Sequence, residues 1–268
     1  MRYRIKKVLI VFASIMIALW FLTPVVLIVL ASLTPSSEYY DPHKILPTKL
    51  TLDHLYKLFV VLDGWQATLN SLEVAGVAIG LSFLIGLPAG YALTRFVFKG
   101  KNFFRLLILL TRSFPALVMA VPLVVLYLKI GISDTLFGVA LAHTSMILPF
   151  VVLITSSILA GISVEYEEAG MIFGLSRFQS FLKITLPLAL PGLAASAIFA
   201  FIMSWNEVFV ASVLTLINRT LPAHILNTAI ASPDYFKFAA GTVMAVPAMV
   251  FIFFTRKYLV SMWGISLK

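Results

Sequence analysis

The stretch EYEEAGMIFGLSRFQSFLKITLPLALPG, residues 165–192, interrupts a chain that is otherwise dominated by long apolar runs. Its first half is polar and contains glycine, and it lies between an apolar run that ends near residue 160 and another that begins near residue 188. Its distinctive residues are spaced in an orderly way: Glu168, Ala169, Gly174, Ile184, Leu186 and Pro187. A segment that merely joined two helices would not need such spacing, so this stretch is a candidate functional element.

The composition places this stretch in a membrane protein. The chain has 268 residues, of which 61% are hydrophobic and 12% charged, and its mean hydropathy is +1.03. A soluble domain carries about 25% charged residues. Backbone in lipid must satisfy its own hydrogen bonds, which leaves helices or a closed barrel. The apolar runs show no period-2 alternation, which excludes the barrel. The sequence therefore predicts an all-α, polytopic membrane protein.

Six apolar segments are long enough to cross about 30 Å of hydrocarbon as helices. We expect spans at residues 8–31, 68–94, 103–128, 134–160, 188–216 and 238–256. The first follows the basic start MRYRIKK, and it is too long for the apolar region of a cleavable signal and lacks a small-residue cleavage site. We therefore expect it to remain as a membrane helix, with an external loop after it to residue 65.

Lys and Arg residues collect on one side of these spans, and an excess of both marks the cytoplasmic loops of membrane proteins. With the N-terminus inside, cytoplasmic segments hold 13 of the 20 basic residues and external segments hold six. The distribution predicts that both termini are cytoplasmic, together with residues 95–105 and 161–187, and that 32–66 and 217–237 are external. The net charge of +9 follows from this topology and does not call for a nucleic-acid partner.

Locally, residues 163–187 are expected to form two short helices with a break between them. Ser163 can cap the first helix, whose first turn carries three glutamates. Gly174 breaks it, Ser176 and Gln179 match a capping box for the second helix, and Pro187 is expected to end that helix. Two interpretations remain open from the residues alone. The pair could rest on the lipid headgroups, or it could dock on a cytoplasmic partner and act as a lever.

The spacing resembles the EAA loop of ABC importer permeases, whose pattern is E-A-A, three residues, G, nine residues, I-x-L-P. Gly170 stands where the second alanine is usual, and Phe173 where an acidic residue often precedes the glycine. The resemblance implies that this segment is the coupling helix seated on an ATPase. The residues that would carry the contact are Glu168, Ala169, Gly170, Gly174, Ile184, Leu186 and Pro187.

Other segments are similar to the sugar-importing branch of that family. They are YALTRFVFKGKN (91–102), TRSFPALVMAVPL (111–123) and SWNEVFVA (204–211). Length and loop pattern resemble the smaller subunit of maltose-type permeases, and the resemblance covers a permease core at 66–256, followed by a short tail at 257–268. The tail ends in WGISLK, which differs from the usual glycine–alanine–valine–lysine–glycine ending. The implied architecture is the type I ABC importer permease fold.

The resemblance also implies a complex. A periplasmic or surface-tethered solute-binding protein would deliver a carbohydrate to two paired permease subunits in the plasma (inner) membrane, and two ATPases would bind below them. The sequence has no GxxxxGK[ST] phosphate-binding loop. We therefore expect ATP–Mg to bind to the partner ATPases, with no cofactor, metal or catalytic residue on this chain.

Four residues within the predicted spans are candidates for the substrate pathway: Arg112, Trp205, Asn206 and Glu207. Ionisable side chains at the centre of a bilayer are costly, so they usually face the bundle or water. Arg112, Asn206 and Glu207 could instead form interhelical hydrogen bonds or an Arg–Glu pair, and Trp205 could pack in the core or a subunit interface. His143 is expected to pack with one hydrogen bond. Two other functions fit the sequence less well. An ion-coupled secondary transporter would need an array of intramembrane acids, and a membrane enzyme would need a convergent catalytic or metal site. The sequence shows neither.

Overall fold

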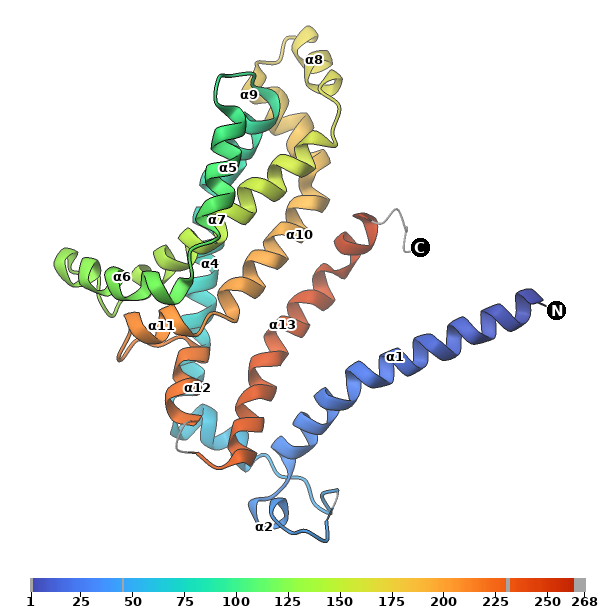
Figure 1. The fold of residues 1–268 in the computed structure, drawn as a ribbon, viewed down its shortest axis with the longest axis vertical. Coiled ribbons are helices and arrows are strands. Elements are labelled where there is room, and N and C mark those ends of the chain that lie inside the picture. Colours follow the sequence, from blue (N-terminus) through green and yellow to red (C-terminus); the bar gives the residue numbers. More distant parts are fainter. Residues whose placement is uncertain (1, 45, 230–231, 263–268) are drawn as a thin grey trace. The chain divides into compact units, whose positions relative to one another are not determined.

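The computed structural model describes residues 2–44, 46–229 and 232–262, and in these ranges the regular structure is helical throughout. Figure 1 shows the helices in chain order. Their bounds are α1 Arg2–Leu33, α2 Ser36–Tyr39, α3 Asp53–Tyr56, the π-helical turn η1 Lys57–Val61, α4 Gly64–Arg95, α5 Lys101–Thr111, α6 Ala116–Ile130, α7 Leu136–Ala160, α8 Glu165–Ile172, α9 Arg177–Ser180, the π-helical turn η2 Phe181–Thr185, α10 Leu186–Trp205, α11 Phe209–Leu214, α12 Leu221–Ala229 and α13 Asp234–Met262.

The chain separates into two compact units. One contains residues 1–65 and 227–246, and the other contains 66–226 and 247–268. The division after Trp65 lies beside the expected start of the permease core, but residues 227–246 group with the N-terminal unit.

In the N-terminal unit, Glu38 organises the loop that follows α1. Its carboxylate accepts hydrogen bonds from the backbone amide of Thr48 at 2.8 Å, from the Thr48 hydroxyl and from Lys44 Nζ at 2.9 Å. These bonds, those from Thr48 first, lower the pKa of Glu38 to about 2. His54 on α3 is buried, and its Nε2 lies 2.9 Å from the Thr34 carbonyl oxygen just after α1. The loop is therefore tied to the end of the first helix by polar contacts.

In the larger unit, α4, α7 and α10 pack through small residues. Gly86 and Gly90 lie four apart on α4 and face α7. A Cβ on Gly86 would lie 2.7 Å from Cγ1 of Val151, and one on Gly90 would lie 2.8 Å from Cγ2 of Thr155. Such four-residue spacing of small residues lets helix backbones approach closely in membranes, where dispersion rather than hydrophobicity holds helices together.

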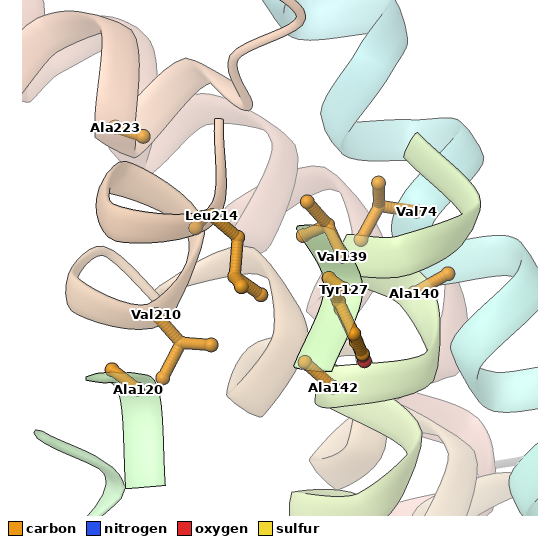
Figure 2. Close-up of a cluster of buried hydrophobic side chains, with 10 residues drawn as sticks. Val74, Ala120, Tyr127, Val139, Ala140, Ala142, Val210, Leu214 and Ala223 are labelled. Carbon is orange, nitrogen blue, oxygen red and sulfur yellow. The ribbon is translucent and has the colours of Figure 1, made fainter. Parts of the chain in front are cut away.

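A second group of buried side chains joins α6, α7 and α11 to the start of α4, as Figure 2 shows. Tyr127 of α6 lies in this cluster, with Val139 and Ala140 of α7 and Val210 and Leu214 of α11. The cluster holds α6 and α11, which are too short to cross a bilayer alone, against the longer helices.

The expected continuous spans at 103–128 and 188–216 are wrong, because each is two helices with a break. After α5 the chain turns at residues 112–115, and Figure 1 shows α6 leaving at a steep angle to α5. Pro115 explains this, since proline cannot donate to the helix ladder and disfavours helical backbone in the preceding residue. After α10 the break is at residues 206–208, where the Glu207 carboxylate accepts the amides of Val210 and Ala211 that begin α11.

Four helical stretches of the described chain are long and apolar enough to cross a membrane: Lys6–Leu33, Gly64–Arg95, Leu136–Ala160 and Arg177–Trp205. They agree with a polytopic helical protein, while the count of six spans remains a prediction. The final residues of the expected cytoplasmic tail, 263–268, lie outside the described residues.

Candidate functional site

The segment at 161–187 forms the helix–bend–helix element that its spacing predicts. α8 ends at Ile172, and Gly174 has φ +90°, in the left-handed region that only glycine adopts readily. The capping box at the start of α9 is confirmed. The Gln179 amide donates to Ser176 Oγ at 3.2 Å, and the Ser176 amide donates to Gln179 Oε1 at 2.9 Å. The bend therefore lies at Gly174.

Two local expectations need correction. Pro187 does not end the second helix, because η2 runs directly into α10 and Pro187 occupies its first turn, where a missing N–H costs little. The second short helix is thus continuous with a membrane helix. The N-cap position of α8 is Val164 and not the expected Ser163. Ser163 lies one residue earlier, where its Oγ accepts a hydrogen bond from the Glu165 amide at 3.3 Å.

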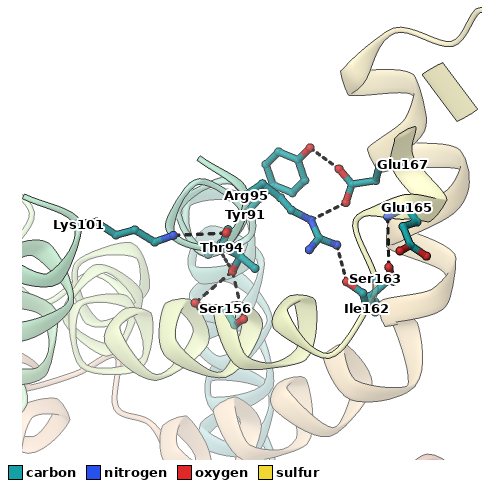
Figure 3. A network of polar contacts seen from close by, with 10 residues as sticks. Tyr91, Thr94, Arg95, Lys101, Ser156, Ile162, Ser163, Glu165 and Glu167 are labelled. Atoms are coloured by element: carbon teal, nitrogen blue, oxygen red, sulfur yellow. Dashed lines mark hydrogen bonds and ion pairs between the residues drawn. The ribbon is translucent and has the colours of Figure 1, made fainter. Parts of the chain in front are cut away.

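Buried polar contacts, drawn in Figure 3, join the base of this segment to α4. Arg95 Nε lies 2.7 Å from Glu167 Oε1, and the Tyr91 hydroxyl donates to Glu167 Oε2 at 2.7 Å. Arg95 Nη2 also donates to the carbonyl of Ile162 at 2.9 Å. Glu167 is 3% exposed. The last turn of α4 therefore holds both the start of the loop and the first helix of the segment.

Glu167 is ionised in this setting. Burial raises the pKa of a carboxyl group, but the hydrogen bonds from Tyr91 and Arg95 outweigh it, so the pKa of Glu167 lies below its ordinary value. The buried carboxylate and the Arg95 guanidinium thus remain a charged pair at neutral pH, and each satisfies the other.

The predicted coupling residues divide into an inner and an outer set. Gly170 is buried, and a Cβ there would lie 2.5 Å from Cδ1 of Ile184, so it lets α8 pack against η2. Glu168, Ala169 and Gly174 are exposed, as are the large apolar side chains of Ile172 and Phe173 at the bend. Leu186 is half-buried and Pro187 exposed. One face of the element is fixed to the bundle, and the other is free.

Sequence reasoning missed Glu167, Arg95 and Tyr91. One signal was available, since Glu167 and Gly170 are three residues apart and therefore share a face of α8. A buried glycine on that face places Glu167 inward and Glu168 outward. The partner on α4 could not be read from the same pattern.

The four candidates for the substrate pathway do not form one cluster. Trp205 is fully buried and stacks on Phe201 with ring centroids 5.6 Å apart, which favours a packing role. Asn206 is exposed at the end of α10. Arg112 lies in the break after α5 with its guanidinium carbon 3.6 Å from the centre of the Phe150 ring.

Glu207 is buried, and both of its oxygens accept backbone amides of α11 at 2.9 Å. His143 Nε2 lies 3.3 Å from Glu207 Oε2, and its Nδ1 is 2.8 Å from Ser204 Oγ. This arrangement is a capped helix start supported by α7, which the sequence did not reveal. Across the described residues no group of three His, Cys, Asp or Glu side chains is placed to hold a metal ion.

Several known proteins match this chain over most of its length. The chain is 29% identical over 248 residues to the inner membrane ABC transporter permease protein YcjP of Escherichia coli, covering 90% of this chain and 88% of that one. It is 28% identical to the trehalose transport system permease protein SugB of Mycobacterium tuberculosis, covering 90% and 89%. It is 32% identical to the arabinooligosaccharides transport system permease protein AraQ of Halalkalibacterium halodurans, covering 88% and 87%.

Among solved structures, the fold is similar to a chain of a bacterial ABC transporter involved in the import of the acidic polysaccharide alginate. The TM-score is 0.74 at 20% identity, and the match covers 95% of this chain and 96% of that one. A chain of the MetNI methionine ABC transporter matches with a TM-score of 0.62 at 19% identity, covering 79% and 99%. Residues 82–262 match the family described as "Binding-protein-dependent transport system inner membrane component". The chain therefore belongs to the family of inner membrane permease components of binding-protein-dependent ABC transporters.

Proposed function

We propose that this chain is the permease subunit of an ATP-driven importer that moves a carbohydrate across the plasma membrane. Relatives aligned over most of their length include permeases named for trehalose, arabinooligosaccharides and diacetylchitobiose, which supports a sugar. The segment 161–187 docks on a cytoplasmic ATPase and passes its motion to the membrane helices.

One observation carries the coupling role. The segment is fixed at its base by the buried Arg95–Glu167 pair and continues without a break into α10, while its outer face exposes Ile172, Phe173 and Glu168. Exposed apolar side chains around a single bend suit a compact interface with a protein partner. A pair of helices resting on lipid would not need a rigid buried anchor to α4.

The importer would contain a second homologous permease, two ATP-binding subunits and an extracellular or periplasmic solute-binding protein. ATP–Mg would bind to the ATPases, and both termini of this chain would be cytoplasmic. The apolar side chains of α1 support a membrane partner, since the 18-residue apolar window of that helix is 0% buried within this chain. Lipid or the second permease would cover it.

A permease for another small solute is the alternative. The chain is 36% identical over 150 residues to the spermidine/putrescine transport system permease protein PotC of Escherichia coli, but this covers 56% of the chain and 57% of that relative. The carbohydrate permeases align over a larger share of both chains, which favours the sugar.

The test is transport by the assembled importer in proteoliposomes. Trehalose, diacetylchitobiose, arabinotriose, maltose and spermidine are supplied together with the solute-binding protein and ATP inside the vesicles, and the contents are analysed by mass spectrometry. We expect ATP-dependent accumulation of at least one sugar. Accumulation of spermidine alone, or of none of the five, would contradict the carbohydrate assignment.

A further inference from the structure

A cavity of about 610 Å³ opens beside the break between α5 and α6. Its walls come from that break and from the middle of α7, with Met203 of α10 closing one side. The residues that matter here are Thr111, Arg112, Phe114, Ser145 and Phe150. Cavities of this size, mostly apolar with a few placed polar groups, are typical of small-molecule sites.

With residues 161–187 on the cytoplasmic side, as in the proposed function, the cavity would lie at mid-depth in the membrane. Thr94 near the end of α4 bonds to Ser156 near the end of α7, and Lys101 Nζ at the start of α5 lies 3.4 Å from the Thr94 carbonyl oxygen, so the three helix ends are level. From Lys101 to Arg112 a helix rises about 16 Å, and the hydrocarbon core is about 30 Å thick. If the level of these helix ends marks the cytoplasmic boundary, Arg112 lies near the bilayer centre.

A guanidinium at this depth needs compensation. Within the described part of the chain, Arg112 has the face of Phe150 at 3.6 Å and no carboxylate partner. The aromatic ring stabilises the charge in part, but it does not satisfy the five N–H donors. Because an exposed arginine at mid-depth cannot face lipid without great cost, these donors point to water or a polar ligand.

The cavity also offers hydrogen-bond acceptors. Thr111 Oγ1 donates to the Ile108 carbonyl at 2.7 Å, and Ser145 Oγ donates to the Ala142 carbonyl at 2.7 Å. With their hydrogens committed to their own helices, both hydroxyl oxygens have lone pairs free to accept. A cationic donor, two acceptors and the rings of Phe114 and Phe150 thus line one space.

We propose that this cavity is a carbohydrate subsite on the transport pathway, an inference that rests on the proposed function and names where this chain contacts its substrate. Adjacent sugar hydroxyls both donate and accept, which matches a lining that offers the Arg112 donors and the Thr111 and Ser145 acceptors. The apolar face of a sugar ring packs on Phe114, whose side chain is exposed. The fixed positive charge admits neutral or anionic sugars and disfavours cationic solutes such as polyamines.

Cysteine accessibility tests whether water reaches this cavity. The method suits this chain because it contains no cysteine of its own. Ser145→Cys in the assembled importer should react with a water-soluble thiol reagent at least tenfold faster than Leu109→Cys. Leu109 is a matched control, since it lies two residues from Thr111, on the opposite side of α5, and is 49% exposed. The transported sugar, with binding protein and ATP present, should slow the Ser145→Cys reaction severalfold, and spermidine should not.

The transport arm uses the same vesicles and the same five solutes as the test of function. For the sugar that accumulates, Arg112→Gln should raise the apparent KM about tenfold, and Arg112→Lys by less, since lysine keeps the charge but loses the planar fork. Two results would overturn the subsite. One is an unchanged KM in both variants, and the other is a Ser145→Cys reaction rate that equals that of Leu109→Cys or is not changed by the accumulating sugar. Sugar uptake by the unmodified chain would still support the proposed function. Failure of every sugar to accumulate would overturn the function itself.

Discussion

Arg95 and Glu167 form a buried ion pair that joins the last turn of α4 to the first helix of the segment at 161–187, with Arg95 Nε 2.7 Å from Glu167 Oε1. Their side chains are 8% and 4% exposed. A pair this dry is a rigid connection, because separating it would leave two uncompensated charges in a poorly solvated place. Any motion imposed on α8 would therefore reach α4 directly.

Breaking this pair on one side should be costly. Glu167→Ala leaves Arg95 buried without its partner, and we expect a loss of about 3 kcal/mol of stability together with uncoupling of transport from ATP hydrolysis. Thermal unfolding in detergent and uptake by the assembled importer measure the two effects. Glu165→Ala, at an exposed position two residues earlier, is the control and should change neither. Equal behaviour of the two variants would show that the anchor has no special role.

The same pair predicts a pH dependence. The pKa of Glu167 is lowered in the folded protein, so its contribution to stability is fully present above the ordinary glutamate pKa of about 4.3 and is lost as the pH falls through the lower folded value. The difference in melting temperature between the unmodified chain and Glu167→Gln should be constant from pH 7 to about pH 5 and shrink below about pH 4. A difference that grew on acidification would have the wrong sign.

How far the sequence predicts this site depends on the range of each interaction. The bend at Gly174 and the capping box at Ser176 are local, and both were readable from spacing. Arg95 and Glu167 are 72 positions apart, and no local pattern around either residue identifies the other as its partner. Only the packing of α4 against α7, through Gly86 and Gly90, brings the two together.

The two broken spans show a different limit. Hydropathy stays high throughout 103–128 and 188–216, so a search for apolar runs predicts one continuous helix in each and does not detect the breaks. Pro115 was a visible signal for the first break. The second depends on Glu207, whose carboxylate satisfies the first amides of α11, and glutamate is not among the favoured N-cap residues. Hydropathy does not reveal a helix start that is capped by an unusual side chain.

Asp134 should control the order of the loop after α11. Its φ is +56°, in the left-handed region, where Asp63 also lies with a φ of +53°. Its Oδ1 accepts the amides of Leu216 at 2.9 Å, Ile217 at 3.1 Å and Asn218 at 3.2 Å. Asp134→Ala should cost about 1–2 kcal/mol and speed proteolysis within residues 215–219, whereas Asp134→Asn, which keeps an acceptor and tolerates this φ, should cost less. Limited proteolysis followed by mass spectrometry measures the rate of cleavage within residues 215–219. We expect this rate to be lowest for the unmodified chain, higher for Asp134→Asn and highest for Asp134→Ala.

The membrane orientation is testable with a single cysteine. Leu50 lies in the loop between α2 and α3 and is 66% exposed, and the chain has no competing thiol. If the excess of Lys and Arg marks the cytoplasmic side, Leu50→Cys should react with an impermeant reagent added outside intact cells. Glu168→Cys should react only after the cells are opened. The reversed pattern would invert the topology and remove the coupling role from residues 161–187.

Gly174 tests the coupling role most directly. No atom lies within 4 Å of a Cβ placed there, so the obstacle to substitution is the φ of +90° and the approach of a partner, and not crowding within this chain. Gly174→Leu should leave the protein inserted and assembled while abolishing transport and substrate-stimulated ATP hydrolysis. Glu168→Lys, which reverses an exposed charge near the start of α8, should act in the same direction.

Two controls separate strain from lost contact. Gly174→Asn accepts a left-handed backbone more readily than leucine, so it should retain more activity if strain dominates and no more if the bulk of the side chain blocks the partner. Glu165→Lys places the same charge reversal one turn earlier, at the start of α8, and should retain coupling if the contact is centred on Glu168. Reconstitution with the second permease and the ATPase, with assembly and transport measured in one preparation, decides between the two interpretations of the segment. If it only rested on lipid, leucine at 174 would add apolar contact, and both Gly174→Leu and Glu168→Lys would transport normally.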